Sequence, residues 1–143
     1  MDGLSKLFGG MHAAATGLAA ERIRIDVIAR NIANAQTTHV PGGGPYRRQV
    51  VYFEPLVRRL VDGSEVTSGV RVTGVGEDHK TPFERIYDPS HPDADVEGFV
   101  RMPNVNATRE MADLITAVRA YEANLSVQET FVQMAERALR LAQ

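Results

Sequence analysis

Apolar residues recur at alternating spacings of four and three at both ends of the chain. Near the N-terminus, a set at every seventh position has no polar member and comprises Leu4, Met11, Leu18, Ile25 and Ile32. Near the C-terminus, the equivalent unbroken set comprises Met111, Val118, Leu125, Val132 and Leu139. This spacing is typical of a coiled-coil seam, and it predicts long helices over residues 1–36 and 105–143.

The C-terminal helix has clear start signals and no internal breaker. Pro103 precedes it, Asn106 is placed to cap its first turn, and Glu110 brings an acidic group to its N-terminal end. Neither Gly nor Pro occurs after Asn104. Such a helix would be about 55 Å long at 1.5 Å per residue, which exceeds the usual length in globular proteins.

The N-terminal helix is interrupted by Gly9, Gly10 and Gly17, each of which costs about 1 kcal/mol relative to Ala. We therefore expect it to be stable only when other elements pack on it. Both apolar stripes could also be the core faces of an ordinary helical bundle. Further apolar residues outside the two sets favour more than one partner surface for each helix, namely Ile23, Ile28, Ile115, Phe131, Met134 and Leu141.

Between the helices, over residues 37–104, the pattern changes to short β-branched or aromatic runs. The runs Tyr46–Phe53, Val66–Val75 and Phe83–Tyr87 predict a small antiparallel β insert. Linkers are expected at Thr37–Pro45 and Asp88–Asp95, where prolines and glycines prevent regular structure. The predicted fold class is α+β, with long N- and C-terminal helices that form a coiled-coil-like pair around this insert.

Composition narrows the function classes. The 143 residues fit one domain, and 16 basic against 18 acidic residues give a net charge of −2 without a charged tail. Nucleic acid and anionic lipid are therefore not expected as partners. Polar residues and glycines interrupt the first twenty residues, so we expect neither a cleaved signal peptide nor direct membrane insertion.

Candidate chemical motifs are incomplete. Gly42–Gly44 are followed by Pro45 and Tyr46, not by the Lys and Ser or Thr of a phosphate-binding loop. The acidic stretch at Asp93–Gly98 matches only the first half of a calcium-binding loop, and the histidines are scattered. We therefore predict no catalytic residue, no cofactor and no metal site, and we expect that the protein is not an enzyme.

Two pairs of arginines, Arg47 with Arg48 and Arg58 with Arg59, are the local basic clusters. Acidic residues lie among or beside them. We interpret both pairs as part of a solvated strand or loop face, and a docking patch for an acidic neighbouring subunit is the alternative.

The segment Ala29–Thr37 resembles the asparagine-rich signature of flagellar rod, hook and related axial proteins. The positions that carry this resemblance are Asn31, Ala33, Asn34 and Thr37. Asn34 can take a left-handed backbone conformation at a helix end, and asparagine side chains can bond the backbone of a closing turn. A second block that includes Pro103, Asn104, Tyr121 and Asn124 is similar to the C-type proximal rod proteins of the bacterial flagellar basal body.

The resemblance implies a structural subunit of the periplasm-spanning rod, which polymerises through its terminal helices into a torque-transmitting shaft and export channel. It implies copies of the chain itself, other rod proteins and the flagellar type III export apparatus as partners, and export without a cleaved signal peptide. A free-standing coiled-coil adaptor is the alternative. A small enzyme or ligand-binding domain is a more distant third hypothesis.

Overall fold

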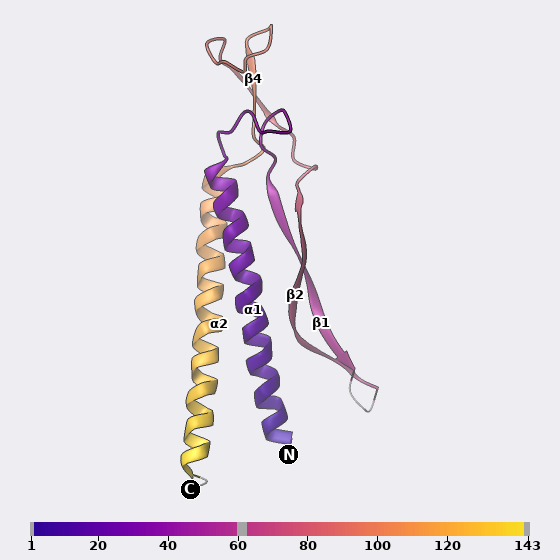
Figure 1. Ribbon diagram of the computed structural model, residues 1–143, viewed down its shortest axis with the longest axis vertical. Coiled ribbons are helices and arrows are strands. Elements are labelled where there is room, and N and C mark those ends of the chain that lie inside the picture. Colours follow the sequence, from indigo (N-terminus) through magenta and orange to yellow (C-terminus); the bar gives the residue numbers. More distant parts are fainter. Residues whose placement is uncertain (1, 60–62, 142–143) are drawn as a thin grey trace.

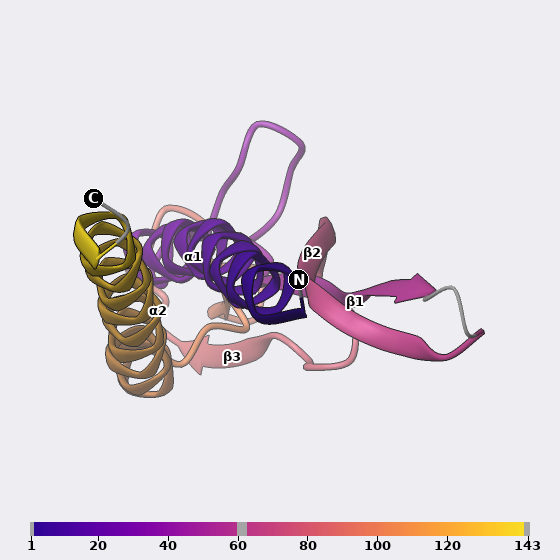
Figure 2. The same cartoon turned by 90° about the horizontal axis from the view of Figure 1, so that it is seen from below.

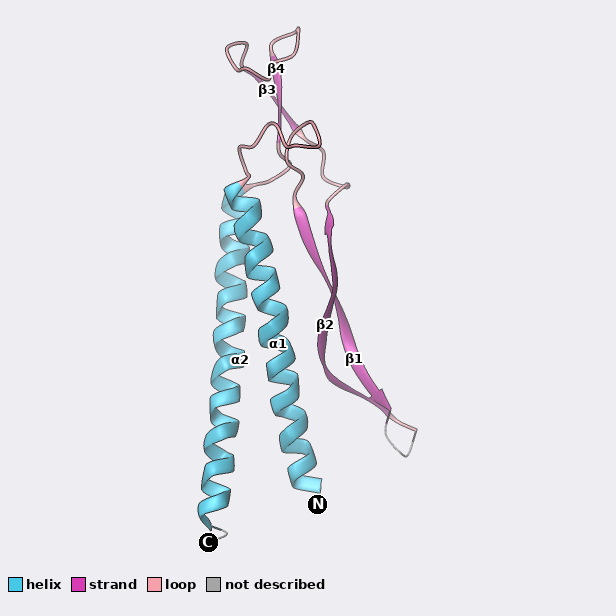
Figure 3. Ribbon diagram, in the orientation of Figure 1, coloured by secondary structure: helices cyan, strands magenta, loops and turns pink. Residues whose placement is uncertain are grey.

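The computed structural model describes residues 2–59 and 63–141, and it describes side chains for residues 8–59 and 63–140. The elements are α1 (Asp2–Ala33), β1 (Gln49–Arg59), β2 (Glu65–Glu77), β3 (Glu84–Tyr87), β4 (Phe99–Met102) and α2 (Ala107–Leu141). The two helices run antiparallel, the β1–β2 hairpin lies along α1, and the β3–β4 hairpin extends beyond one end of the pair (Figures 1 and 3). The predicted α+β fold with terminal helices is confirmed.

The C-terminal end of α1 and the N-terminal end of α2 lie side by side (Figure 1), and we call this the inner end of the helix pair. Side-chain hydrogen bonds define both helix ends there. Asn34 Nδ2 donates to the carbonyl of Arg30 at 2.9 Å, and the Thr37 hydroxyl donates to Asn34 Oδ1 at 3.2 Å. Asn34 does not use the left-handed conformation that is open to it, because no described non-glycine residue has a positive φ. The predicted cap on α2 is confirmed, since the Arg109 N–H donates to Asn106 Oδ1 at 3.0 Å.

The β insert consists of two separate two-stranded antiparallel sheets and not one. The long hairpin pairs Gln49 with Glu77 at one end and Arg59 with Glu65 at the other, with two register irregularities between. The short hairpin pairs β3 with β4. Strand β4 (Phe99–Met102) was not predicted, because its pairing with β3 and not its own composition defines it as a strand.

Helix α1 lies between α2 and the long hairpin, and it contacts both (Figure 2). The apolar core of the described residues is thin, and small side chains form half of it: Ala14, Ala20, Val27, Ile28, Val100 and Ala117. Asn31, Asn104 and Glu110 are also buried. Hydrogen bonds and ion pairs of these three residues therefore add to a small apolar core in holding the elements together.

Two glycines of α1 let α2 come close. A Cβ at Gly10 would lie 2.7 Å from the Phe131 ring, and a Cβ at Gly17 would lie 3.0 Å from the Asn124 carboxamide. A Cβ at Gly9, by contrast, would meet nothing within 4 Å. Gly10 and Gly17 weaken the isolated helix, but they also create space for larger side chains of α2.

This contrast leads to a prediction about α1. Gly9→Ala should raise the free energy of unfolding by up to about 1 kcal/mol, because it improves helix propensity without a steric cost. Gly17→Ala should give no gain or a loss, because its Cβ would compress the Asn124 contact. Denaturant unfolding of both variants measures the difference. An equal gain in both would show that α2 does not approach α1 closely at Gly17.

Candidate assembly site

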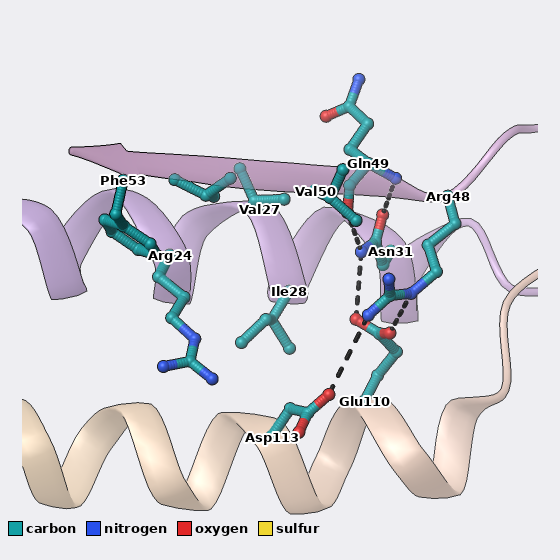
Figure 4. Close-up of a pocket in the computed structure, with 11 residues that line it drawn as sticks. Arg24, Val27, Ile28, Asn31, Arg48, Gln49, Val50, Phe53, Glu110 and Asp113 are labelled. Atoms are coloured by element: carbon teal, nitrogen blue, oxygen red, sulfur yellow. Dashed lines mark hydrogen bonds and ion pairs between the residues drawn. The ribbon is translucent and has the colours of Figure 1, made fainter. Parts of the chain in front are cut away.

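Polar side chains from separate parts of the chain meet at the inner end of the helix pair. They are Asn31 of α1, Tyr46 and Arg48 before β1, Asn104 before α2, and Glu110 in the first turn of α2. We call this set the polar junction. Figure 4 shows Asn31, Arg48 and Glu110 converging between the two helices and the start of β1.

Asn31 is the centre of the polar junction and is 1% exposed. Its Nδ2 donates to Glu110 Oε2 at 3.0 Å and to the Gln49 carbonyl at 2.9 Å. Its Oδ1 accepts from the Gln49 N–H at 2.9 Å and from the Tyr46 hydroxyl at 3.0 Å. Both donors and both acceptor positions of this carboxamide are therefore used.

Glu110 is also 1% exposed, and Arg48 neutralises its carboxylate. Arg48 Nε lies 2.6 Å from Glu110 Oε1, and the same guanidinium lies 3.8 Å from Asp78 and 3.9 Å from Asp113. Burial of a carboxylate is unfavourable unless it is paired and hydrogen-bonded. Asn31 and Arg48 together meet that requirement.

Asn104 connects the polar junction to the loop after β2. Its Oδ1 accepts from the Arg48 N–H at 2.7 Å, and its Nδ2 donates to the carbonyls of Asp78 and Thr81 at 2.9 and 3.0 Å. Hydrogen bonds from Thr81 hold the pKa of Asp78 below its ordinary value. Burial raises the pKa of Tyr46 above its ordinary value, and its hydroxyl donates to Asn31.

The polar junction is suited to holding elements together and not to catalysis. A cavity of about 380 Å³ opens beside it, lined by residues that include Arg24, Val27, Ile28 and Asp113 (Figure 4). The carboxylate and carboxamide that face this cavity are already bonded to each other. Within the described part of the chain, no group of acidic or histidine residues could hold a metal ion.

The second feature is an exposed apolar stripe on α2, which we call the α2 flank. Its side chains are 37–68% exposed and comprise Met111, Ile115, Val118, Leu125, Val132 and Leu139. The contact with α1 instead uses the residues one position earlier, among them Glu110, Asn124 and Phe131. The every-seventh set of α2 therefore does not form the centre of the helix pair, as its regularity had suggested.

The corresponding set on α1 is half-buried where it is described, at Met11, Leu18, Ile25 and Ile32. The side chain of Leu4 lies outside the described residues. Near the outer ends of the helices, an apolar cavity of about 460 Å³ is lined mainly by Phe8, Met11, Phe131, Val132, Ala135 and Leu139. Val132 and Leu139 belong to the α2 flank and also line this cavity, so the α2 flank continues into it.

The remaining motif residues have different surroundings. Ala33 ends α1 and is exposed, Pro103 is buried, and Tyr121 is half-buried on α2. Asn124 faces Gly17, and its Nδ2 donates to the carbonyl of Ala120 at 3.0 Å. Asn31 and Asn104 are thus the motif residues that the fold brings together in the polar junction.

The interpretation of the arginine pairs is wrong for Arg48, whose side chain is 24% exposed and pairs with buried Glu110. No local signal could have revealed this contact, because the partners are far apart in the chain. Arg47 stacks on the Phe83 ring at 4.3 Å. Arg58 and Arg59 lie on the exposed part of the hairpin, as expected, and Arg59 pairs with exposed Glu65.

Two family models match the ends of the chain. The model described as "Flagella basal body rod protein" matches residues 11–38, and "Flagellar basal body rod FlgEFG protein C-terminal" matches residues 96–141. These ranges contain Asn31, Asn104 and Glu110, whereas Tyr46 and Arg48 lie between them. In the described residues, neither helix is long and apolar enough to cross a membrane.

Curated relatives match almost the whole chain. The protein named "Flagellar basal-body rod protein FlgC" of Borreliella burgdorferi is 44% identical, over 96% of this chain and 98% of its own length. Proteins of the same name from Aquifex aeolicus and Salmonella typhimurium are 42% and 39% identical, each over more than 90% of both chains. Because these are structural rod proteins, the expectation that the chain is not an enzyme is confirmed. The chain belongs to the FlgC family of flagellar basal-body rod proteins.

Proposed function

We propose that this chain is a structural subunit of the proximal rod of the flagellar basal body and that it polymerises through its terminal helices. The α2 flank is the observation that carries this proposal. From Met111 to Leu139 it extends about 42 Å along the helix, at 1.5 Å per residue. Exposed large apolar side chains that recur on one helix over this distance support an interaction site.

In this proposal, copies of the chain and other rod proteins cover the α2 flank and the apolar cavity. The every-seventh sets of both helices are the packing residues, so residues 1–36 and 105–143 act as assembly helices. The hairpins of residues 37–104 lie outside the helix pair. A tube of helices packed in this way transmits torque and encloses the export channel.

We also propose that the flagellar type III apparatus exports the chain and that no signal peptide is cleaved from it. Residues 2–33 form α1, which packs on both α2 and the long hairpin. Removal of this segment would eliminate Asn31 and the other contacts of α1. This packing of α1 supports the proposal that the exported chain keeps the segment.

The free-standing adaptor hypothesis uses the same flank differently. An adaptor would bury it in a closed dimer, whereas a rod subunit would remain a monomer until it polymerises or joins rod proteins. Light scattering of the purified chain separates these outcomes. A tagged chain expressed in a strain without its own FlgC should also restore motility and co-purify with basal bodies. A stable dimer that neither polymerises nor enters basal bodies would contradict the proposal.

A further inference from the structure

Three contacts between the two helices are separated by multiples of seven residues. Gly10 faces Phe131, Gly17 faces Asn124, and Asn31 bonds Glu110. Along α1 these positions are separated by seven and fourteen residues, and along α2 they are separated by the same numbers in the opposite direction. All three contacts therefore belong to one antiparallel register.

The heptad pattern alone does not specify this register. A slip of one heptad moves α2 by about 10.5 Å, at 1.5 Å per residue, and keeps the same face of each helix in the interface. The small core residues, such as Ala14 and Ala117, discriminate little between these alternatives. Selection of one register needs a contact that can form at only one position along the axis of the helix pair.

We propose that the polar junction selects the axial register of the helix pair, with Arg48 and Glu110 as its positioning residues. A slip in one direction would place Ala117 opposite Asn31 and leave the Glu110 carboxylate without its carboxamide donor. A slip in the other direction would bring Arg24 toward Glu110 but would place Pro103, which lies outside α2, at the level of Asn31. Either slip breaks hydrogen bonds that the native register satisfies, and buried polar groups are known to fix helix register in this way.

The glycine contacts support the same register. The 2.7 Å approach of Phe131 to the Cβ position of Gly10 shows that a larger residue there would have to displace the ring. The junction differs from these contacts because it also includes Tyr46 and Arg48, which lie outside both matched family segments. It therefore ties the register of the helices to the attachment of the long hairpin.

Disulfide trapping tests the proposal, and the chain contains no cysteine of its own. Ala14→Cys is combined in turn with Gln128→Cys, which reports the native register, and with Tyr121→Cys or Ala135→Cys, which report the two one-heptad slips. Without a register preference the three pairs would form at similar rates, because they close loops of similar length. Oxidation also traps registers that are sampled only briefly.

In the otherwise unaltered chain, the pair with Gln128→Cys should form at least about tenfold faster than either slipped pair. Adding Arg48→Met and Glu110→Leu together removes both positioning residues of the junction, so that neither partner of this ion pair is left buried without the other. The preference should then fall several-fold, and slipped pairs should appear. The control Ile28→Ala creates a cavity near the same level, so it should slow all three pairs without redistributing them.

Several outcomes would overturn the proposal. They are similar rates for the three pairs in the unaltered chain, an unchanged preference after the double substitution, and redistribution by Ile28→Ala equal to that of the double substitution. Loss of all three disulfides in the double variant would also overturn it, because the junction would then be needed for the helices to pair at all and not for the choice of register.

Discussion

Leu125→Asp is expected to reduce incorporation of the chain into basal bodies to an undetectable level while leaving the isolated fold intact. Leu125 is 40% exposed on the α2 flank, so a carboxylate there remains largely hydrated in the single chain. In a packed rod the same carboxylate would be buried without a partner, which costs several kcal/mol per subunit. The measurement compares cellular and basal-body-bound protein in a strain without its own FlgC.

Ser126→Asp is the matched control, because it introduces the same charge at the next residue on an exposed polar position. It should incorporate at close to the normal level. If the Leu125→Asp protein were incorporated as well as this control, the α2 flank would not be a packing surface. If both failed equally, a general effect of added negative charge would explain the result.

Arg48→Met is expected to lower the free energy of unfolding by about 3 kcal/mol, a large fraction of the stability of a small domain. The substitution leaves the Glu110 carboxylate buried without its cation, and it also removes the guanidinium that lies 3.8 Å from Asp78 and 3.9 Å from Asp113. Denaturant unfolding monitored by circular dichroism measures the change.

Arg59→Met provides the control on the same hairpin. Arg59 and Glu65 are both more than half exposed, so their ion pair should contribute no more than about 1 kcal/mol. An equal loss of stability in the two variants would show that the polar junction is no more important than a surface ion pair.

The sequence pattern was sufficient for the helices because their regularity extends over many turns. It also located the cap at Asn106, the loop at Thr37–Pro45 before β1 and the loop at Asp88–Asp95 between β3 and β4. The face of α2 that contacts α1 was predicted one residue away from its position. The regular set of large apolar residues suggested that face, but α1 packs on a set of α2 residues that are smaller or more polar. A packed interface between two chains and one within a chain leave the same heptad pattern.

The polar junction could not be predicted from local signals. Asn31 and Asn104 were identified by their resemblance to a family motif, but nothing near Arg48 indicates a partner in α2. Its contact depends on the path of the chain from α1 through the 37–45 loop, which places the start of β1 beside the helix pair. Strand β4 was missed for a related reason, because its pairing with β3 and not its own composition defines it.

The thin core has a mechanical consequence for the assembled organelle. With few large apolar side chains buried inside each chain, little work is needed to open one subunit, and most of the cohesive energy of the shaft must lie at the boundaries between subunits. The stiffness of such a shaft is therefore a collective property that appears only after neighbours are in place. A growing end should be compliant, and rigidity should develop behind it as each newly added chain becomes surrounded.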